Sequence, residues 1–353
     1  EAAIKLARAR TGRLGILSTV GGFHGKTLGA LSATGRPAYQ KPFGLPVPGF
    51  AYVPFGDLGA LEDALAKGEF AAFLVEPIQG EGGVVPAPDG YLEAALALCR
   101  ARGTLFVLDE VQTGLGRTGQ LFSMEEGDGP DVLLLAKALG GGLVPIGAML
   151  TTADAWDHEF GFLHSSTFAN NNLACRVALK TLEILERDDR RLVRHVARNG
   201  AYLLERLRDL AVRFPGVIAG VRGKGYLAGV EFHPFEGSDS HVLTYLSNGG
   251  YLVPALCGYL LNVHRIITAP VFNNSQVVRI EPPFTVDRPE IDRVVGALDV
   301  LCDALDRRDV YHVLRFLIGE DELAPGRERF APRRAPAARN VGPGVTPGRS
   351  ASV

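Results

Sequence analysis

Cysteine is scarce in this chain, with four residues among 353. These residues lie far apart and form no C-x-x-C pair: Cys99, Cys175, Cys257 and Cys302. The spacing argues against a disulfide framework and gives no sign of a metal site. We therefore expect free, buried thiols, no bound metal and a reducing compartment, the cytoplasm.

Strong net charge and long hydrophobic runs are also missing. The formal net charge of −2 gives no reason to expect nucleic acid or an anionic membrane as a partner. No apolar stretch reaches the length of a membrane span, and no signal peptide is recognisable. The chain begins at Glu1 rather than Met, and we expect it to be truncated. Its length and its 46% of hydrophobic residues predict a large core and two domains.

The most informative stretch reads as strand, acidic pair, glycine-rich loop, strand and lysine. Residues 105–108 are all apolar, which predicts a parallel strand buried on both faces, and they end at Asp109 and Glu110. The loop leads to a second apolar run, residues 132–135, and then to Lys137. Ligands bind at the carboxyl ends of strands in open α/β sheets, so this lysine is placed to react. A solvated lysine before a turn is the alternative interpretation.

The order of these motifs resembles the class III aminotransferases, which bind pyridoxal phosphate (PLP). The resemblance rests on L-F-V-L-D-E-V-Q-T-G-L-G-R-T-G, P-D-V-L-L-L-A-K-A-L-G-G-G and P-I-G-A, and further motifs extend it from Glu1 to about Leu305. Among putrescine, ornithine and acetylornithine aminotransferases, the segment G-R-P-A-Y-Q-K-P-F is most similar to the putrescine branch. The family implies an α/β protein of PLP-dependent transferase fold type I. Its sheet would be mixed, mostly parallel and seven-stranded, flanked by helices, with a smaller α+β C-terminal domain.

We expect a large PLP-binding domain at residues 1–189 and a small domain at 190–319. The boundary falls between two predicted helices, about 173–186 and 190–213. Residues 320–353 are rich in proline, arginine, glycine and alanine, which is typical of a disordered tail or linker.

Two other segments are unusual in composition or length. Residues 36–55, rich in proline, glycine and aromatics, predict an irregular surface loop. Residues 248–275 are longer than we expect in close relatives. They include Tyr259, Asn262 and His264, which could reshape the substrate entrance.

The resemblance implies roles for residues around PLP. Lys137 would hold the cofactor as a Schiff base and then act as general base. Asp109 would keep the pyridine nitrogen protonated, and Gln112 would donate to the phenolic oxygen. Phe23 and Val111 would pack on opposite faces of the ring, although a phenylalanine beside a turn can also be an ordinary core residue.

Three further residues resemble cofactor contacts. His24 follows Phe23 and is either a cofactor contact or structural. Ser166 and Thr167 match residues that reach the partner's PLP phosphate across a dimer, which implies a homodimer. The G-G-N-P that usually follows in the family is A-N-N-N here. The family's phosphate-binding loop, which precedes the first helix, has no match in this chain.

The resemblance also implies a substrate site. Arg279, in V-V-R-I-E-P-P, would bind the carboxylate of 2-oxoglutarate or glutamate. Glu81 would pair with Arg279 and release it when a carboxylate arrives, or it forms only a loop salt bridge. Glu76 lies at the same predicted strand end. Lys26 stands where ornithine-type relatives carry arginine and cannot make the same bidentate contact, so the resemblance implies a donor without a carboxylate at that end.

The predicted function is PLP-dependent transamination from a terminal amine, a diamine such as putrescine or an ω-amino acid, to 2-oxoglutarate. Other PLP reactions of the family, aminomutase and decarboxylase chemistry, use the same contacts. A non-catalytic dimerisation or scaffold domain of a larger synthase, with fused domains beyond either end, is the alternative. The motif G-K-T at residues 25–27 also suggests a P-loop ATPase, but a P-loop requires glycine where Val20 stands.

Overall fold

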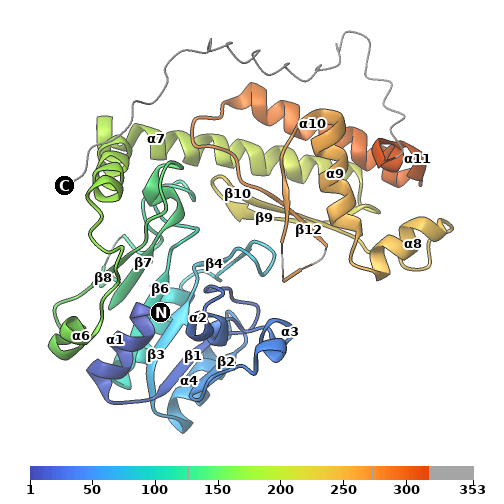
Figure 1. Cartoon of the computed structure of the whole chain (residues 1–353). Coiled ribbons are helices and arrows are strands. Elements are labelled where there is room, and N and C mark those ends of the chain that lie inside the picture. The colour runs from blue at the N-terminus through green and yellow to red at the C-terminus, as the bar shows by residue number, and fades with distance from the viewer. Residues whose placement is uncertain (126, 272, 275, 318–353) are drawn as a thin grey trace, which may run out of the picture.

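The larger of two main sheets organises the N-terminal half of the protein (Figure 1). The computed structural model describes residues 1–125, 127–271, 273–274 and 276–317. The sheet has the order β2-β1-β3-β6-β7-β8, and every pairing is parallel except that of β7 with β8. Its strands are β1 (Gly15–Thr19), β2 (Phe50–Val53), β3 (Phe70–Val75), β6 (Leu105–Asp109), β7 (Val132–Leu135) and β8 (Ala148–Thr151). The expected α/β class and mostly parallel sheet are confirmed.

The number of strands differs from the expectation. The sheet has six strands within the described residues, not seven, because the seventh was inferred from the family and no further segment of the described chain pairs with β2 or β8.

Residues 36–55 are also more regular than predicted. They contain α3 (Pro37–Gln40), a 3-10 turn (Lys41–Phe43) and β2. An edge strand tolerates nearby proline and glycine, which is why composition concealed it.

Helices cover both faces of this sheet. They are α1 (Ala2–Thr11) and α6 (His158–Leu163) on one face, and α4 (Leu58–Lys67) and α5 (Tyr91–Ala101) on the other. Successive side chains of a strand point to opposite faces, so Val107 packs with α1 and α6 while Phe106 and Leu108 pack with α4 and α5. This double burial explains the unbroken apolar sequence of β6.

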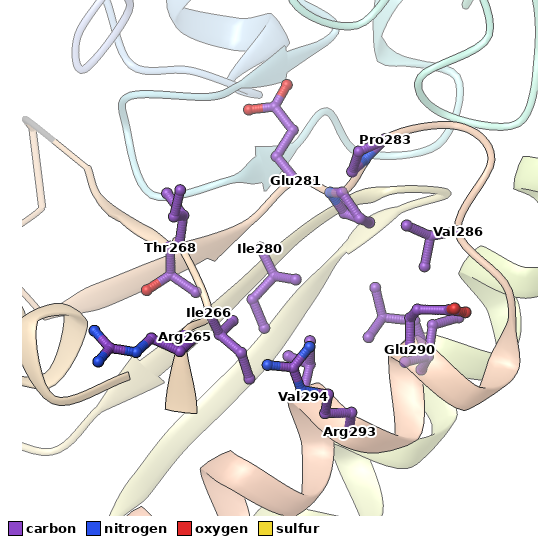
Figure 2. Close-up of a pocket in the computed structure, with 14 residues that line it drawn as sticks. Arg265, Ile266, Thr268, Ile280, Glu281, Pro283, Val286, Glu290, Arg293 and Val294 are labelled. Carbon is purple, nitrogen blue, oxygen red and sulfur yellow. The ribbon is translucent and has the colours of Figure 1, made fainter. Parts of the chain in front are cut away.

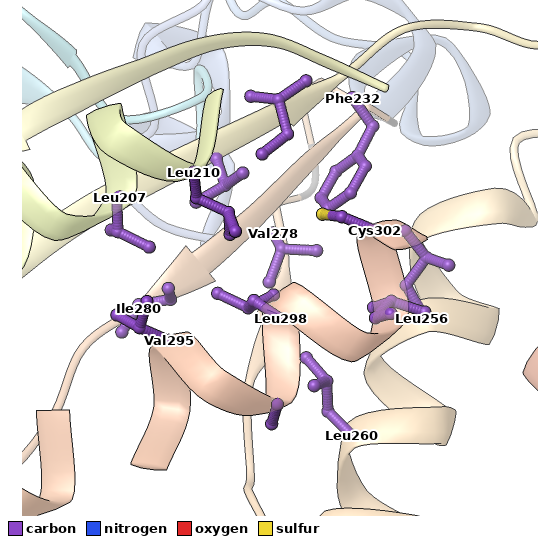
Figure 3. Close-up of a cluster of buried hydrophobic side chains, with 14 of the residues drawn as sticks. Leu207, Leu210, Phe232, Leu256, Leu260, Val278, Ile280, Val295, Leu298 and Cys302 are labelled. Carbon is purple, nitrogen blue, oxygen red and sulfur yellow. The ribbon is translucent and has the colours of Figure 1, made fainter. Parts of the chain in front are cut away.

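The smaller sheet lies in the C-terminal half and is antiparallel throughout, with the order β11-β12-β10-β9. Its strands are β9 (Ile218–Lys224), β10 (Leu227–Phe232), β11 (Ala269–Pro270) and β12 (Val277–Ile280). Nearby helices are α8 (His241–Asn248), α9 (Leu252–His264), α10 (Arg288–Asp306) and α11 (Val310–Leu314). Figure 3 shows side chains from β10, β12, α9, α10 and the preceding α7 meeting in one apolar cluster.

The long helix α7 (Asn172–Arg213) connects the two halves and changes direction within its length (Figure 1). Its backbone is not helical from Arg187 to Arg190. The two helices predicted on either side of this point are therefore confirmed. The division into domains at residue 189 stays a prediction, and the predicted tail, 320–353, lies outside the described residues.

A close backbone contact fixes the glycine-rich loop after β6 against the C-terminal half. A Cβ on Gly225 would lie 2.4 Å from the carbonyl carbon of Thr118. A Cβ on Gly200 of α7 would likewise lie 2.4 Å from the carbonyl carbon of Gly225. Only glycine permits this approach. Beside it, Tyr226 N–H donates to the Arg117 carbonyl at 2.9 Å. The loop that carries Gln112 is thereby held against the β9–β10 hairpin.

Candidate active site

Three ionisable residues follow the carboxyl ends of neighbouring strands. Glu76 follows β3, Asp109 ends β6, and Lys137 comes two residues after β7. Strands β6 and β7 are in register, with Asp109 opposite Leu134. The chain thus places an amine and two carboxylates along one edge of the sheet, where ligands bind in open α/β folds.

A buried hydrogen bond joins His24 to Asp109. The Nδ1 of His24 lies 2.8 Å from Oδ2 of Asp109, with side chains 2% and 7% exposed. The other carboxylate oxygen of Asp109 accepts the Val111 N–H at 3.1 Å. The Nε2 of His24 is buried and has no hydrogen-bond partner among the described residues. His24 therefore touches the acid that the sequence assigned to the cofactor.

Glu76 completes this buried group. Its carboxylate accepts the Phe23 N–H at 2.8 Å and the Gly80 N–H at 3.3 Å. Burial raises the pKa of Glu76 to about 7, with His24 opposing the shift and Asp109 adding to it. Burial lowers the pKa of His24, but the hydrogen bond and charge of Asp109 outweigh it, so that pKa is raised overall. The group favours a protonated His24 between two acids.

Glu110, the second acid of the pair, has a different role. It is 1% exposed and accepts hydrogen bonds from Thr113 Oγ1 at 2.9 Å and from the Ser123 N–H at 2.6 Å. Burial raises its pKa, while the bonds from Ser123 and Thr113 oppose the shift. Glu110 therefore holds the two ends of the glycine-rich loop together.

Lys137 begins a 3-10 turn (Lys137–Gly140) and has φ of 41°, a left-handed conformation that is uncommon outside glycine. It lines a cavity of about 490 Å³ together with Gln112, Arg117 and Glu281. The rest of this lining is largely apolar and includes Phe284. The cavity lies where the carboxyl end of β7 faces the segment that follows β12.

Arg279 of β12 and Glu81 form an ion pair with 2.5 Å between Nη1 and Oε1. Glu81 lies in the turn between β4 (Ile78–Gln79) and β5 (Val85–Pro86). The two side chains are only 13% and 9% exposed. Arg279 also lies 3.5 Å, Nε to Oε2, from Glu281, which accepts a hydrogen bond from Gln112 Nε2 at 3.2 Å. The predicted pairing of Glu81 with Arg279 is present.

Phe23 and Lys26 lie in the loop before α2 (Leu28–Ala33). The Nζ of Lys26 is 5.3 Å from the ring centroid of Phe23 and 3.8 Å from that of Tyr39. At these distances the ammonium interacts with both aromatic rings. Lys26 therefore lies near the ring that the resemblance places on the cofactor.

Ser166 and Thr167 do not join the other predicted residues within one chain. Both are exposed, in the segment between α6 and α7. Ser166 lines a separate cavity with Met149 and Phe168. Their predicted contact with a partner's cofactor is untested by a single chain.

Sequence reasoning missed Glu281 and Arg117 as members of the site. Alternation along a strand places Arg279 and Glu281 on the same side, and this signal could have identified Glu281. Tyr259, expected near the substrate entrance, is instead fully buried in the C-terminal cluster and lies 2.8 Å from His312 Nε2. Its apolar neighbours in α9 place it there.

The described residues do not meet the requirements of a metal site, a disulfide or a membrane-spanning helix. In the described part of the chain, no three His, Cys, Asp or Glu side chains are grouped to hold a metal ion. The four cysteines are free thiols, and three of them are buried. No helix within the described ranges combines the length and apolar character needed to cross a membrane.

A family profile, Aminotransferase class-III, matches residues 1–301. The chain therefore belongs to the class-III aminotransferase family. It is 44% identical over 314 residues to putrescine aminotransferase of Pectobacterium atrosepticum, a match covering 85% of this chain and 63% of that protein. It is 40% identical over 345 residues to aminotransferase PigE of a Serratia species, a match covering 86% and 40%. The chain thus spans less than two thirds of the length of either relative.

Solved structures support the same family. An ornithine aminotransferase from Toxoplasma gondii superposes with a TM-score of 0.74 and 31% identity. The match covers 87% of this chain and 70% of that one. That structure is described as having partial occupancy of PLP at its active site. The fold type expected from the sequence is therefore confirmed.

Proposed function

We propose that this chain transfers an amino group from a terminal amine, a diamine such as putrescine or an ω-amino acid, to 2-oxoglutarate, with PLP as cofactor. The observation that carries this proposal is the position of Lys137 and Asp109 after neighbouring parallel strands. The putrescine aminotransferase and ornithine aminotransferase relatives support the terminal amine.

The donor set fits PLP. Lys137 supplies the amine that would bind its aldehyde, and the buried Asp109 supplies the negative charge that would face its ring nitrogen. Phe23 and Val111 would pack on the ring, and Gln112 would donate to its phenolic oxygen. Ser166 and Thr167 of a partner would bind its phosphate. When bound, PLP withdraws electrons from the substrate carbon that loses a proton.

The protein's own residues then orient the substrate and move a proton. Lys137 would act as the general base, taking a proton from the substrate carbon that bears the amino group and returning it to a different atom. His24 would hold Asp109 in place through the 2.8 Å hydrogen bond. Arg279 would bind the 2-oxoglutarate carboxylate, for which Glu81 must turn aside. Glu76 would fix the backbone of Phe23, and Lys26 would lie near its ring.

We also propose a homodimer in the cytoplasm. Large apolar side chains are exposed around the segment of Ser166 and Thr167: Leu143, Phe162, Leu163, Phe168 and Leu173. Exposed apolar clusters of this kind are typical of protein interfaces. Four free thiols favour a reducing compartment.

The test is a visible absorption spectrum with added PLP, recorded for the unmodified chain and for Lys137→Ala. We expect a band that the variant lacks and that putrescine or glutamate removes. A band that persists in Lys137→Ala contradicts the role of the lysine. A chain that forms no band favours a non-catalytic dimerisation or scaffold domain of a larger protein.

A further inference from the structure

Glu281 lies at the boundary between the two halves of the protein. It follows β12, two residues after Arg279, and lines the same cavity as Lys137. It also lines a second cavity, between β12 and α10. Figure 2 shows its carboxylate directed away from the other labelled residues of that second cavity and toward the ribbons of the N-terminal half. The carboxylate therefore points out of the second cavity, and Glu281 is shared with the cavity that Lys137 lines.

Glu281 is held more loosely than the neighbouring ion pair. Its carboxylate oxygens lie 3.5 Å from the Nε atoms of both Arg117 and Arg279, and the side chain is 26% exposed. Glu81, by contrast, lies 2.5 Å from Arg279 and is 9% exposed. A carboxylate has about four lone-pair positions. Glu281 therefore keeps acceptor capacity for a ligand in the cavity.

Arg117 is committed to other partners. Its Nη1 donates to the Pro282 carbonyl at 2.5 Å and to the Tyr226 carbonyl at 3.3 Å, and its guanidinium lies 4.5 Å from the Phe284 ring centroid. These contacts fix the guanidinium against the backbone. Arg117 can orient Glu281, but it cannot follow the carboxylate toward a ligand.

The lining of the cavity that Glu281 and Lys137 share suits an alkyl chain. Apolar side chains contribute much of this lining: Ile184, Leu185, Leu192 and Phe284. An extended methylene chain would be desolvated against them. The cavity therefore combines the lysine that would hold PLP, an apolar wall and an acidic group, an arrangement that suits a ligand with an amino group at each end of an alkyl chain.

We propose that Glu281 binds the second ammonium group of a diamine donor while the first amino group lies at the cofactor that Lys137 would hold. This inference rests on the proposed function, and it assigns the residue that selects the donor. Arg117, Arg279, Glu81 and Glu281 together carry no formal net charge. While Glu81 remains paired with Arg279, a donor carboxylate beside Glu281 would be repelled, whereas an ammonium forms a charge-assisted hydrogen bond.

The test compares Glu281→Gln with the unmodified chain on three donors of matched length: 1,4-diaminobutane, butylamine and 4-aminobutanoate. Glutamine keeps an acceptor for Gln112 and nearly the same volume, so the variant isolates the charge. We expect kcat/KM for the diamine to fall about ten- to a hundredfold, the range for losing one charged hydrogen bond. The value for butylamine should stay within about twofold, since it cannot use this bond.

The matched control is Glu231→Gln. Glu231 is also a glutamate paired with an arginine, Arg222, in the same sheet, but it does not line the cavity. This variant should leave the ratio of diamine to butylamine activity unchanged. An equal fall of that ratio in both variants overturns the assignment of Glu281.

Calorimetric titration of the chain without PLP separates this inference from the proposed function. We expect 1,4-diaminobutane to bind more tightly than butylamine, and Glu281→Gln to remove the difference. Equal affinities in the unmodified chain, or a preference that survives in the variant, overturn the ammonium site. A diamine preference in a chain that never forms the PLP absorption band contradicts the proposed function and leaves the ammonium site standing.

Discussion

His24 Nδ1 and Asp109 Oδ2 lie 2.8 Å apart, although 85 residues separate them in the sequence. Both side chains are almost fully buried, so water cannot replace either partner. Glu76, buried beside them, interacts electrostatically with both. The carboxylate assigned to the cofactor thus belongs to a group of three coupled residues, and the first prediction concerns its third member.

Replacing Glu76 by glutamine should change how stability depends on pH. The folded chain keeps the Glu76 proton until about pH 7, whereas the pKa of a glutamate in the unfolded chain is about 4.5. The folded state binds more protons between these values, so the free energy of unfolding falls as pH rises through this window. The variant Glu76→Gln has no carboxyl group here and does not show this fall. The free energy of unfolding of the variant, minus that of the unmodified chain, should therefore rise by about 2 to 3 kcal/mol from pH 5 to pH 8.

Urea unfolding at both pH values measures this change. The pKa of His24, which burial lowers and Asp109 and Glu76 raise, is raised overall, so His24 also contributes stability that is lost as pH rises through its folded pKa. Glu76→Gln removes part of this contribution as well, and the difference between the two proteins reports Glu76 together with its interaction with His24. A difference that is the same at pH 5 and pH 8 would mean that Glu76 is already ionised in the folded chain.

Replacing Glu81 by glutamine should shift the preference between substrates. The neutral side chain holds Arg279 less strongly, so a substrate carboxylate need not displace a paired anion. We expect the rate with glutamate relative to that with putrescine to rise about tenfold, which corresponds to about 1.4 kcal/mol. Stopped-flow loss of the PLP absorption band measures both rates. A ratio that falls contradicts the exchange of partners proposed for Arg279.

Replacing Gly200 by alanine should destabilise the protein. The new Cβ would lie 2.4 Å from the Gly225 backbone, which must shift, at a cost of about 1 to 3 kcal/mol. Gly296→Ala is the matched control, because it is also in a helix, α10, and its Cβ meets nothing within 4 Å. That substitution should be neutral or stabilising by up to about 1 kcal/mol. Thermal and urea unfolding compare the two variants, and equal stabilities would contradict the close contact.

Replacing Phe168 by aspartate should weaken self-association. Phe168 is 85% exposed and adjoins the predicted partner contacts, so a charge there would have to be desolvated in the dimer. Val212→Asp, at an 80% exposed apolar position on the distant part of α7, is the control. Sedimentation equilibrium should show a dissociation constant raised at least about tenfold for Phe168→Asp alone. Equal effects, or a monomeric unmodified chain, contradict the proposed interface.

Local sequence was sufficient where neighbouring residues decide the structure. The strand β6 was predicted from an apolar run of neighbouring residues, and it is present. Strand β2 was missed because its pairing with β1 depends on a segment about 35 residues away, while its own surroundings suggested a loop.

The candidate site also combines features that local sequence predicts with features that depend on the tertiary structure. The sequence by itself indicated the family and predicted Lys137 and Asp109 as the reactive groups, because both follow strands whose apolar runs are readable. Only the tertiary structure decided that His24 binds Asp109, that burial raises the pKa of Glu76, and that Glu281 faces the lysine's cavity. These relationships depend on distances and desolvation between segments far apart in the chain, which local patterns do not encode.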